Sequence, residues 1–148
     1  MIVFKTSNGL TADQLYEIAV IDNSIPPLYQ DDFAVTDELN QKRTEYYKDI
    51  ILKGFFNAAF HDGMLVGFHA IKLMEQDVIF VHIATFWVHS DFQRTGIGRQ
   101  LKIQGEEWAR SMNCRYIQTS VHMNNPRMLE INEKAGYKVI SQNMQKSL

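Results

Sequence analysis

The strongest constraint on the fold is an apolar stretch that runs directly into a loop with two glycines. Residues 78–88 (VIFVHIATFWV) carry apolar side chains at successive positions, so both faces of a strand there would be buried. We therefore expect this strand to be central in a sheet. After the loop, apolar spacing predicts a helix over residues 97–112. Its apolar stripe consists of Ile97, Leu101, Trp108 and Met112.

Two further helices are expected in the first third of the chain. The first covers residues 11–23 and has Thr11 as its N-cap. The pair Pro26-Pro27 must end it, because proline cannot continue a helix. The second covers residues 36–53 and opens at Thr36, with acidic side chains in its first turn that suit the helix dipole.

Strands and one more helix account for the remaining segments. An apolar run from Phe55, the turn Asp62-Gly63 and a second apolar run predict a β-hairpin. Near the C-terminus we expect a strand over 115–121, a helix over 126–134 and a last strand over 137–144. The order is two helices, three strands, helix, strand, helix and strand, which predicts a mixed α/β (α+β) domain.

Composition narrows the class of protein further. The 148 residues suit one domain, residues 1–148, and the net charge of −2 gives no electrostatic case for nucleic acid. No apolar run reaches the roughly 20 residues of a membrane span, so we expect no membrane partner. Cys114 is the only cysteine, which excludes an intrachain disulfide and a cysteine-based metal cluster. We expect no metal site and a reducing, cytoplasmic location.

The loop between strand and helix carries the clearest chemical signal. Gly96 and Gly98 lack a Cβ, so an anion can approach the backbone closely. The first N–H groups of a helix have no partner within it, which makes them a phosphate site. Arg94 and Arg99 add positive charge beside them. Two alternatives remain at this point: a plain tight turn, and a dinucleotide loop, although that loop needs a third glycine that is missing here.

The same residues resemble the signature of the GNAT superfamily of acetyl-CoA-dependent N-acyltransferases. That signature is a strand ending in Val, then x-Pro-x-x-(Gln/Arg)-x-x-Gly-x-(Gly/Ala), then a helix. Val88 to Gly98 matches it in register, except that Ser90 replaces the proline. A second family element, an Asn, a short helix and a Gly-aromatic pair, resembles Asn125 to Tyr137. The resemblance covers residues 78–142 well, and the first half only in the order of its elements.

The resemblance implies a fold and a coenzyme site. The fold would be a mixed, mostly antiparallel sheet flanked by helices, with a splayed central strand pair. The loop would bind the pyrophosphate of acetyl-CoA, and the main chain of the preceding strand would lie along pantetheine and polarise the thioester carbonyl. The residues concerned are Gln93, Arg94, Thr95, Gly96, Ile97, Gly98 and Arg99 in the loop, and Phe86, Trp87 and Val88 in the strand.

Two asparagines complete the coenzyme site that the resemblance implies. Asn125 would contact the coenzyme near the start of the last helix, and it is also a good N-cap. Asn132 is a departure, because many members carry at this place a Tyr that acts as general acid for the thiolate. An asparagine can hydrogen-bond the coenzyme but cannot give up a proton, so proton donation stays unassigned.

Three residues are candidates for the base that accepts the proton of the amine. His82 is on the central strand, six residues before Val88, and should have the side-chain parity of Phe86. Some arylalkylamine acetyltransferases carry a histidine at that strand position. His122 and Glu75 are the alternatives, and each histidine could instead be structural. For the substrate we expect Tyr29, Asp31 and Asp32, since carboxylates beside an aromatic ring suit a cationic amine.

The function expected from these residues is an N-acetyltransferase. It would move an acetyl group from acetyl-CoA to a primary amine by direct attack, with both reactants bound together. Two alternatives remain: a non-catalytic acyl-CoA-binding module, and a nucleotide- or phosphate-binding regulatory domain. The acceptor, among small amines, peptide N-termini, lysines and aminoglycosides, is open, as are the acyl chain and the choice between monomer and homodimer.

Overall fold

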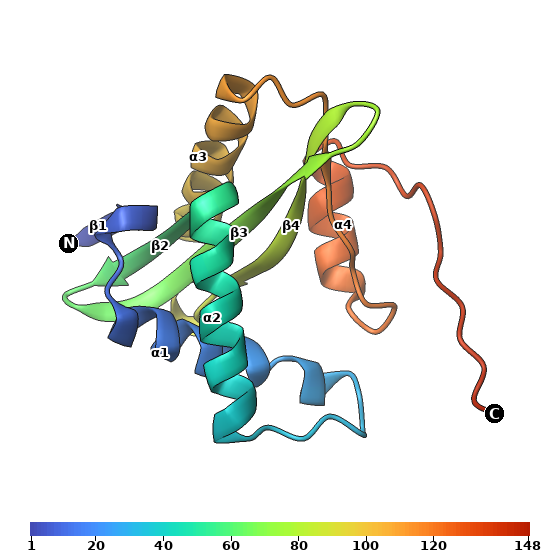
Figure 1. Ribbon diagram of the computed structural model, residues 1–148, viewed down its shortest axis with the longest axis horizontal. Helices are drawn as coiled ribbons and strands as arrows, with labels where there is room; N and C mark the ends of the chain where they lie inside the picture. Colours follow the sequence, from blue (N-terminus) through green and yellow to red (C-terminus); the bar gives the residue numbers. More distant parts are fainter.

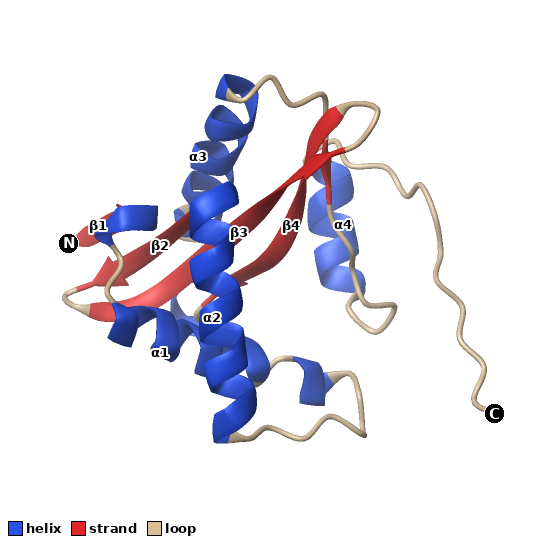
Figure 2. Ribbon diagram, in the orientation of Figure 1, coloured by secondary structure: helices blue, strands red, loops and turns tan.

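A single five-stranded sheet with helices on both faces organises the chain in the computed structural model, which describes residues 1–148 (Figures 1 and 2). The sheet order is β1-β2-β3-β4-β5, with β1 to β4 antiparallel and β5 parallel to β4. The strands are β1 Ile2–Thr6, β2 Phe55–His61, β3 Met64–Glu75, β4 Ile79–Val88 and β5 Ile117–Gln118. The helices are α1 Ala12–Asn23, α2 Asp37–Lys53, α3 Ile97–Ser111 and α4 Pro126–Lys134. This mixed sheet with flanking helices is the fold class that the sequence predicted.

The starts of α1, α2 and α4 lie where the sequence predicted them, and each has a side-chain cap. Thr11 accepts a hydrogen bond from the Gln14 backbone N at 3.2 Å, and Thr36 accepts one from Leu39 N at 3.1 Å. Asn125 caps α4 in the same way through Met128 N. Such caps satisfy N–H groups that a helix leaves unpaired, each contributing about 1 kcal/mol.

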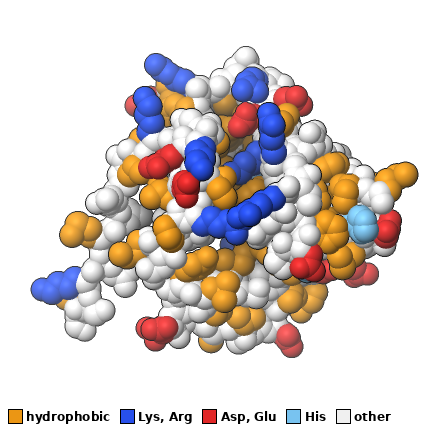
Figure 3. Space-filling model, turned by 180° about the vertical axis from the view of Figure 1, so that it is seen from behind, with side chains coloured by type: hydrophobic (Ala, Val, Ile, Leu, Met, Phe, Trp, Pro, Cys, Tyr) orange, Lys and Arg blue, Asp and Glu red, His pale blue; other side chains and the backbone are white.

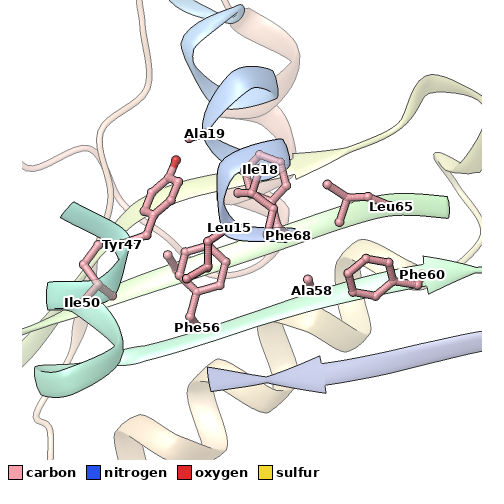
Figure 4. Packing of buried hydrophobic residues seen from close by; sticks show 11 residues of the cluster. Leu15, Ile18, Ala19, Tyr47, Ile50, Phe56, Ala58, Phe60, Leu65 and Phe68 are labelled. Atoms are coloured by element: carbon pink, nitrogen blue, oxygen red, sulfur yellow. The ribbon is translucent and has the colours of Figure 1, made fainter. Parts of the chain in front are cut away.

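Helices α1 and α2 cover one face of the sheet over the largest apolar cluster. Tyr47 of α2 and Ile18 of α1 are fully buried in it against Phe56 and Phe68 of the sheet (Figure 4). The ring of Tyr47 meets that of Phe56 edge to face, with centroids 5.1 Å apart. Burying side chains of this size contributes roughly 1.5–3 kcal/mol each, so this layer anchors the fold.

Helix α3 covers the opposite face, but its buried stripe differs from the prediction. Ile97 and Leu101 are buried as expected, and the stripe continues through Gly105 and Ala109. Met112 lies beyond the helix and is exposed. Gly105 belongs to the stripe because the ring of His69 from β3 lies only 2.6 Å from where a Cβ would be. The spacing of apolar residues in the sequence did not reveal Gly105, because glycine has no apolar side chain.

A β-bulge in β4 changes the direction of its side chains. Ile71 of β3 pairs with Ile83, whereas the adjacent Ala70 pairs with Thr85, so Ala84 is an extra residue in the ladder. Because side chains alternate across a strand, one extra residue reverses which face every later side chain meets. The side chains of β4 before and after Ala84 therefore alternate in different registers.

The ends of the sheet depart from the sequence prediction. Residues 2–6 form strand β1, which was not predicted because its partner β2 is distant in sequence. Only Ile117 and Gln118 of the strand expected over 115–121 pair in the sheet. The strand expected over 137–144 is wrong: residues 138–148 make no backbone hydrogen bond and extend away from the sheet (Figure 1). No helix combines the length and the apolar character that crossing a membrane requires.

Candidate active site

Strands β4 and β5 part shortly after they meet. Their pairing is limited to Val81 with Ile117 and His82 with Gln118. From Ile83 onward β4 has no strand beside it on this side, as the expected splayed pair requires. Parted strands leave backbone groups of β4 available for another chain-like molecule.

The gap between the parted strands forms a cleft of about 250 Å³. Five segments contribute to its walls: the region after α1, β4, the chain after β5, α3 and α4. The lining residues are Ile25, Pro26, Tyr29, Gln30, Ile83, Ala84, Thr85, Phe86, Lys102, Thr119, Ser120, Val121, His122, Asn125, Met128 and Asn132. None of these side chains is a carboxylate, so a cation in the cleft would meet no acidic group in its walls.

The cleft connects the two faces of the sheet. Phe86 points to the α3 face, where its ring lies 4.5 Å from Lys102 Nζ. Thr85 points to the α1 face, where its hydroxyl donates to Asp22 Oδ1 at 2.7 Å. Adjacent residues of one strand thus line the same cleft from opposite sides, and two reactants could enter it from opposite faces.

The anion loop, residues 93–99, presents an unbroken row of free backbone donors. No acceptor in the protein bonds the N–H groups of residues 94–99. Two left-handed residues turn the chain here, Arg94 with φ 63° and Gly96 with φ 90°. Alternation of this kind makes a concave set of N–H groups that suits an anion, and the helix dipole of α3 adds to it.

Charge around the anion loop favours the same ligand. Arg94 and Arg99 are both exposed at the loop, while its side-chain bonds, from Thr95 to Phe92 O and from Gln93 to Val88 O, are internal. Figure 3 shows Lys and Arg side chains, with Asp and Glu side chains among them, on the face turned away from α2. A diphosphate fits this donor set.

The two glycines of the anion loop lack a side chain for different physical reasons. A Cβ at Gly96 would meet no atom within 4 Å, so this position is open to a ligand. A Cβ at Gly98 would lie 2.9 Å from the ring of Phe86, so Gly98 lets α3 pack on β4. That contact joins the start of α3 to the cleft, because Phe86 lines the cleft.

Trp87 and Val88 do not line the cleft with their side chains. The indole of Trp87 stacks on Phe68 at 5.4 Å between ring centroids, and Val88 packs beside Gly98. Both side chains therefore pack against other parts of the protein. Their main chain belongs to the part of β4 that β5 leaves unpaired.

Lys102 is a cleft residue that sequence reasoning missed. Its Nζ donates to Asn132 Oδ1 at 3.1 Å and has no carboxylate partner among the ion pairs. Burial lowers its pKa, and nearby Glu106 opposes this effect only in part. Lysines are usually exposed, so an unpaired, half-buried one in a cleft is a signal that only the structure supplies.

A polar network behind Thr85 was also missed. Asp22, at the end of α1, accepts hydrogen bonds from Thr85 and from the Tyr47 hydroxyl, and Arg43 Nε lies 3.8 Å away. Burial and the Asp22 carboxylate raise the pKa of Tyr47 far above its usual value. Because Thr85 uses its proton toward Asp22, its oxygen can only accept a hydrogen bond from the cleft.

The three candidate bases lie in different places. His82 pairs with Lys72 and Phe86 with His69, and these partners point to opposite faces, so the predicted equal parity of His82 and Phe86 is wrong. The cause is the bulge at Ala84. His82 does not line the cleft, and burial with Lys72 nearby lowers its pKa.

Of the other two, only His122 lies at the cleft. Glu75 ends β3 and is exposed, away from the cleft walls. The ring of His122 stacks on Tyr29 with centroids 5.3 Å apart, and its Nδ1 accepts from Asn124 N at 3.1 Å. In the neutral ring Nε2 then carries the proton.

The expected substrate residues are only partly brought together. Tyr29 lines the cleft, beside Gln30. Asp31 and Asp32 are exposed and do not line it. The acidic part of this loop therefore lies outside the walls, whereas the carboxylate of Asp22 is hydrogen-bonded to the cleft residue Thr85.

Solved structures with the same architecture include proteins described as acetyltransferases and one described as a transcriptional regulator. A Pyrococcus furiosus protein described as an acetyl transferase superposes with a TM-score of 0.79 at 22% identity over 100% of both chains. A transcriptional regulator from Bacillus halodurans C-125 gives a TM-score of 0.78 at 18% identity, also over 100% of both. At these identities the likeness shows the fold alone.

A structure of AAC(6')-Iy, an aminoglycoside N-acetyltransferase, superposes with a TM-score of 0.74 at 13% identity, over 100% of this chain and 98% of that one. Its structures hold CoA or a bisubstrate analogue, CoA-S-monomethyl-acetylneamine. A search of curated proteins finds no match. The model of the acetyltransferase (GNAT) family, however, matches residues 14–137, most of the chain. The chain therefore belongs to the GNAT family and is an acetyl-CoA-dependent acetyltransferase.

Proposed function

We propose that the enzyme transfers the acetyl group to a primary amine by direct attack, with both reactants in the cleft. The observation that carries this proposal is the cleft itself, which Phe86 lines from the α3 face and Thr85 from the α1 face. Acetyl-CoA would enter from the α3 face and the amine from the α1 face. Holding two reactants in one groove replaces a bimolecular encounter and supplies much of the rate.

The coenzyme would be held mainly by backbone groups. The N–H groups of residues 94–99 would bind the pyrophosphate, and Arg94 and Arg99 would add charge. From there pantetheine would follow the unpaired edge of β4 past Phe86 to Asn125 and Asn132, both of which line the cleft. The bisubstrate analogue bound by AAC(6')-Iy joins coenzyme and acceptor in one molecule, which supports direct transfer here by analogy of fold.

The amine would be recognised by acceptors rather than by a carboxylate in the wall. Thr85 offers a lone pair whose geometry Asp22 fixes, and Asp22 adds negative charge behind it. Tyr29, stacked on His122, would provide an aromatic surface for the carbon skeleton or for the cation.

His122 would take the proton that the amine loses. It lines the cleft, unlike His82 and Glu75. Nδ1 must first release the Asn124 N–H, an exposed bond that water can replace at a cost of about 1 kcal/mol. That cost is small beside the 10²–10⁴-fold typical of general-base catalysis.

The test is a panel of primary amines with acetyl-CoA, read by release of the CoA thiol. The panel should include small amines, a peptide with a free N-terminus, a lysine peptide and an aminoglycoside. We expect saturable thiol release with at least one amine, together with N-acetylated product by mass spectrometry. Binding of acetyl-CoA without turnover across the whole panel would contradict the proposal and favour a non-catalytic acyl-CoA-binding module. A protein stabilised by ATP or phosphate but not by acetyl-CoA would instead be a regulatory domain.

A further inference from the structure

We propose that Lys102 supplies the proton and the positive charge that the departing CoA thiolate requires, held in position by Asn132. The inference rests on the proposed function and deepens it. It addresses the acid that a Tyr supplies in many relatives and that Asn132 cannot supply. It is carried by the place of Lys102 in the cleft and by its contacts.

Lys102 lines the cleft, and two other lining residues contact its ammonium group. Asn132 Oδ1 accepts its hydrogen bond at 3.1 Å, and the ring of Phe86 lies under it at 4.5 Å. Lysine has three N–H donors, and the hydrogen bond to Asn132 occupies one. Its partners on α4 and β4 are a neutral amide and an aromatic ring, so the positive charge has no carboxylate partner. It is therefore available to interact with a negative charge that forms in the cleft.

The surroundings of Lys102 tune it for this task. The titratable groups near it are Glu106 on its own helix and His69 on β3, with Tyr137 beyond Glu106. Burial lowers the pKa of Lys102, and burial together with Lys102 lowers the pKa of His69 to about 3, so His69 stays neutral. His69 therefore does not compete as an acid. A lowered lysine pKa approaches that of a thiol, where proton transfer between the two is easiest.

The chemical step balances without another reagent. The amine nitrogen forms a bond to the acetyl carbon, and the carbon–sulfur bond breaks with its electron pair on sulfur. Lys102 Nζ gives a proton to that sulfur, which yields the CoA thiol and a neutral lysine. Lys102 then takes a proton from water, and the proton that His122 takes from the amine passes to solvent.

The decisive experiment does not need the acceptor amine. The thiol of CoA bound to the enzyme is titrated by the ultraviolet absorbance of its thiolate, in wild type, Lys102→Met and Lys134→Met. Lys134 is the control, an exposed lysine of α4 paired with Glu130. A cation close to the sulfur favours the thiolate, so Lys102→Met should raise the pKa of the bound thiol by about one unit or more, while Lys134→Met leaves it unchanged.

Turnover separates proton donation from charge alone. Lys102→Arg keeps the charge, but a guanidinium does not release its proton in proteins. We expect Arg to retain the low thiol pKa and still to lower kcat about 10²-fold with little change in KM for acetyl-CoA. A kcat of the Arg variant equal to wild type would overturn the proton-donor role.

Three further outcomes would overturn the inference or the proposed function. Equal thiol pKa values in wild type and Lys102→Met would overturn the inference, whether or not CoA affinity falls, since a fall in affinity alone makes Lys102 a phosphate ligand. An equal shift in Lys134→Met would overturn it as well, because the effect would then be general charge. Failure of wild type to bind CoA would overturn the proposed function itself.

Discussion

The anion loop and the α1 side of the cleft differ in what builds them. The anion loop offers backbone N–H groups from consecutive residues, set by two left-handed positions and the start of α3. The α1 side offers side chains that three distant segments bring together, as in the contacts of Thr85 with Asp22 and of Tyr29 with His122. A site made of consecutive backbone groups depends on local conformation. A site made of side chains depends on strand register and packing across the whole domain.

The largest effect expected from this comparison is at Gly96. Gly96→Leu would place a side chain over the free N–H groups and weaken acetyl-CoA binding by about 10³-fold, the loss of two or more charge-assisted hydrogen bonds. Gly63→Leu is the matched control, because Gly63 has a similar φ of 85° and equally open space but lies in the β2–β3 turn. Calorimetry should show normal affinity for Gly63→Leu, with a similar loss of thermal stability in both. Equal loss of affinity in the two variants would contradict a specific role of the loop.

The second-largest effect is expected on the α1 side of the cleft. His122→Gln should lower kcat about 10²-fold, because a glutamine amide cannot accept the proton that the amine loses. His82→Gln should leave kcat close to wild type, because His82 lies outside the cleft walls. The measurement is the steady-state kcat of both variants with the best amine of the panel. A strong loss in His82→Gln, with His122→Gln near wild type, would reverse the assignment.

A smaller effect is expected at Arg94. Arg94→Gly removes a charge beside the phosphate site and also relieves a non-glycine residue of its positive φ of 63°. We expect acetyl-CoA affinity to fall about tenfold at low salt, less at high salt, while the melting temperature does not fall. A salt-independent loss would show that Arg94 acts through loop conformation instead.

The smallest effect concerns the acidic residues outside the cleft. The double variant Asp31→Asn and Asp32→Asn should change kcat/KM for any accepted amine by less than about twofold, since both side chains are exposed and charges in water interact weakly. Steady-state kinetics with the best amine of the panel measures it. A tenfold rise in KM would return these carboxylates to the substrate site.

The sequence predicts structure that depends on neighbouring residues better than structure that depends on distant contacts. The cap at Thr11 and the left-handed turn at Gly96 depend on residues close in sequence, so both were predictable. Gly98 is different, because its lack of a Cβ is required by the ring of Phe86 on β4. The bulge at Ala84 is not visible in an apolar strand, and it reversed the face assigned to His82. Lys102 gave no signal, because a lysine within a helix is usually solvated and only packing against Phe86 and Asn132 distinguishes it.

The C-terminal residues illustrate a related limit. An apolar pattern over 137–144 is compatible with a strand, but a strand needs a partner, and residues 138–148 make no backbone hydrogen bond. Val139 and Ile140 are 57% and 74% exposed as a result. Pattern alone indicates which residues could pair, whereas the neighbouring edge decides whether they do.

Hydrogen exchange of the backbone amides tests the central claim most directly, namely that acetyl-CoA binds to the free N–H groups of the anion loop. Without ligand, the amides of residues 94–99 should exchange fast, because no acceptor protects them. Saturating acetyl-CoA should slow these amides together with those of the unpaired part of β4, and leave the Asp62-Gly63 turn unchanged. Unchanged exchange at residues 94–99 in the acetyl-CoA complex would contradict the account.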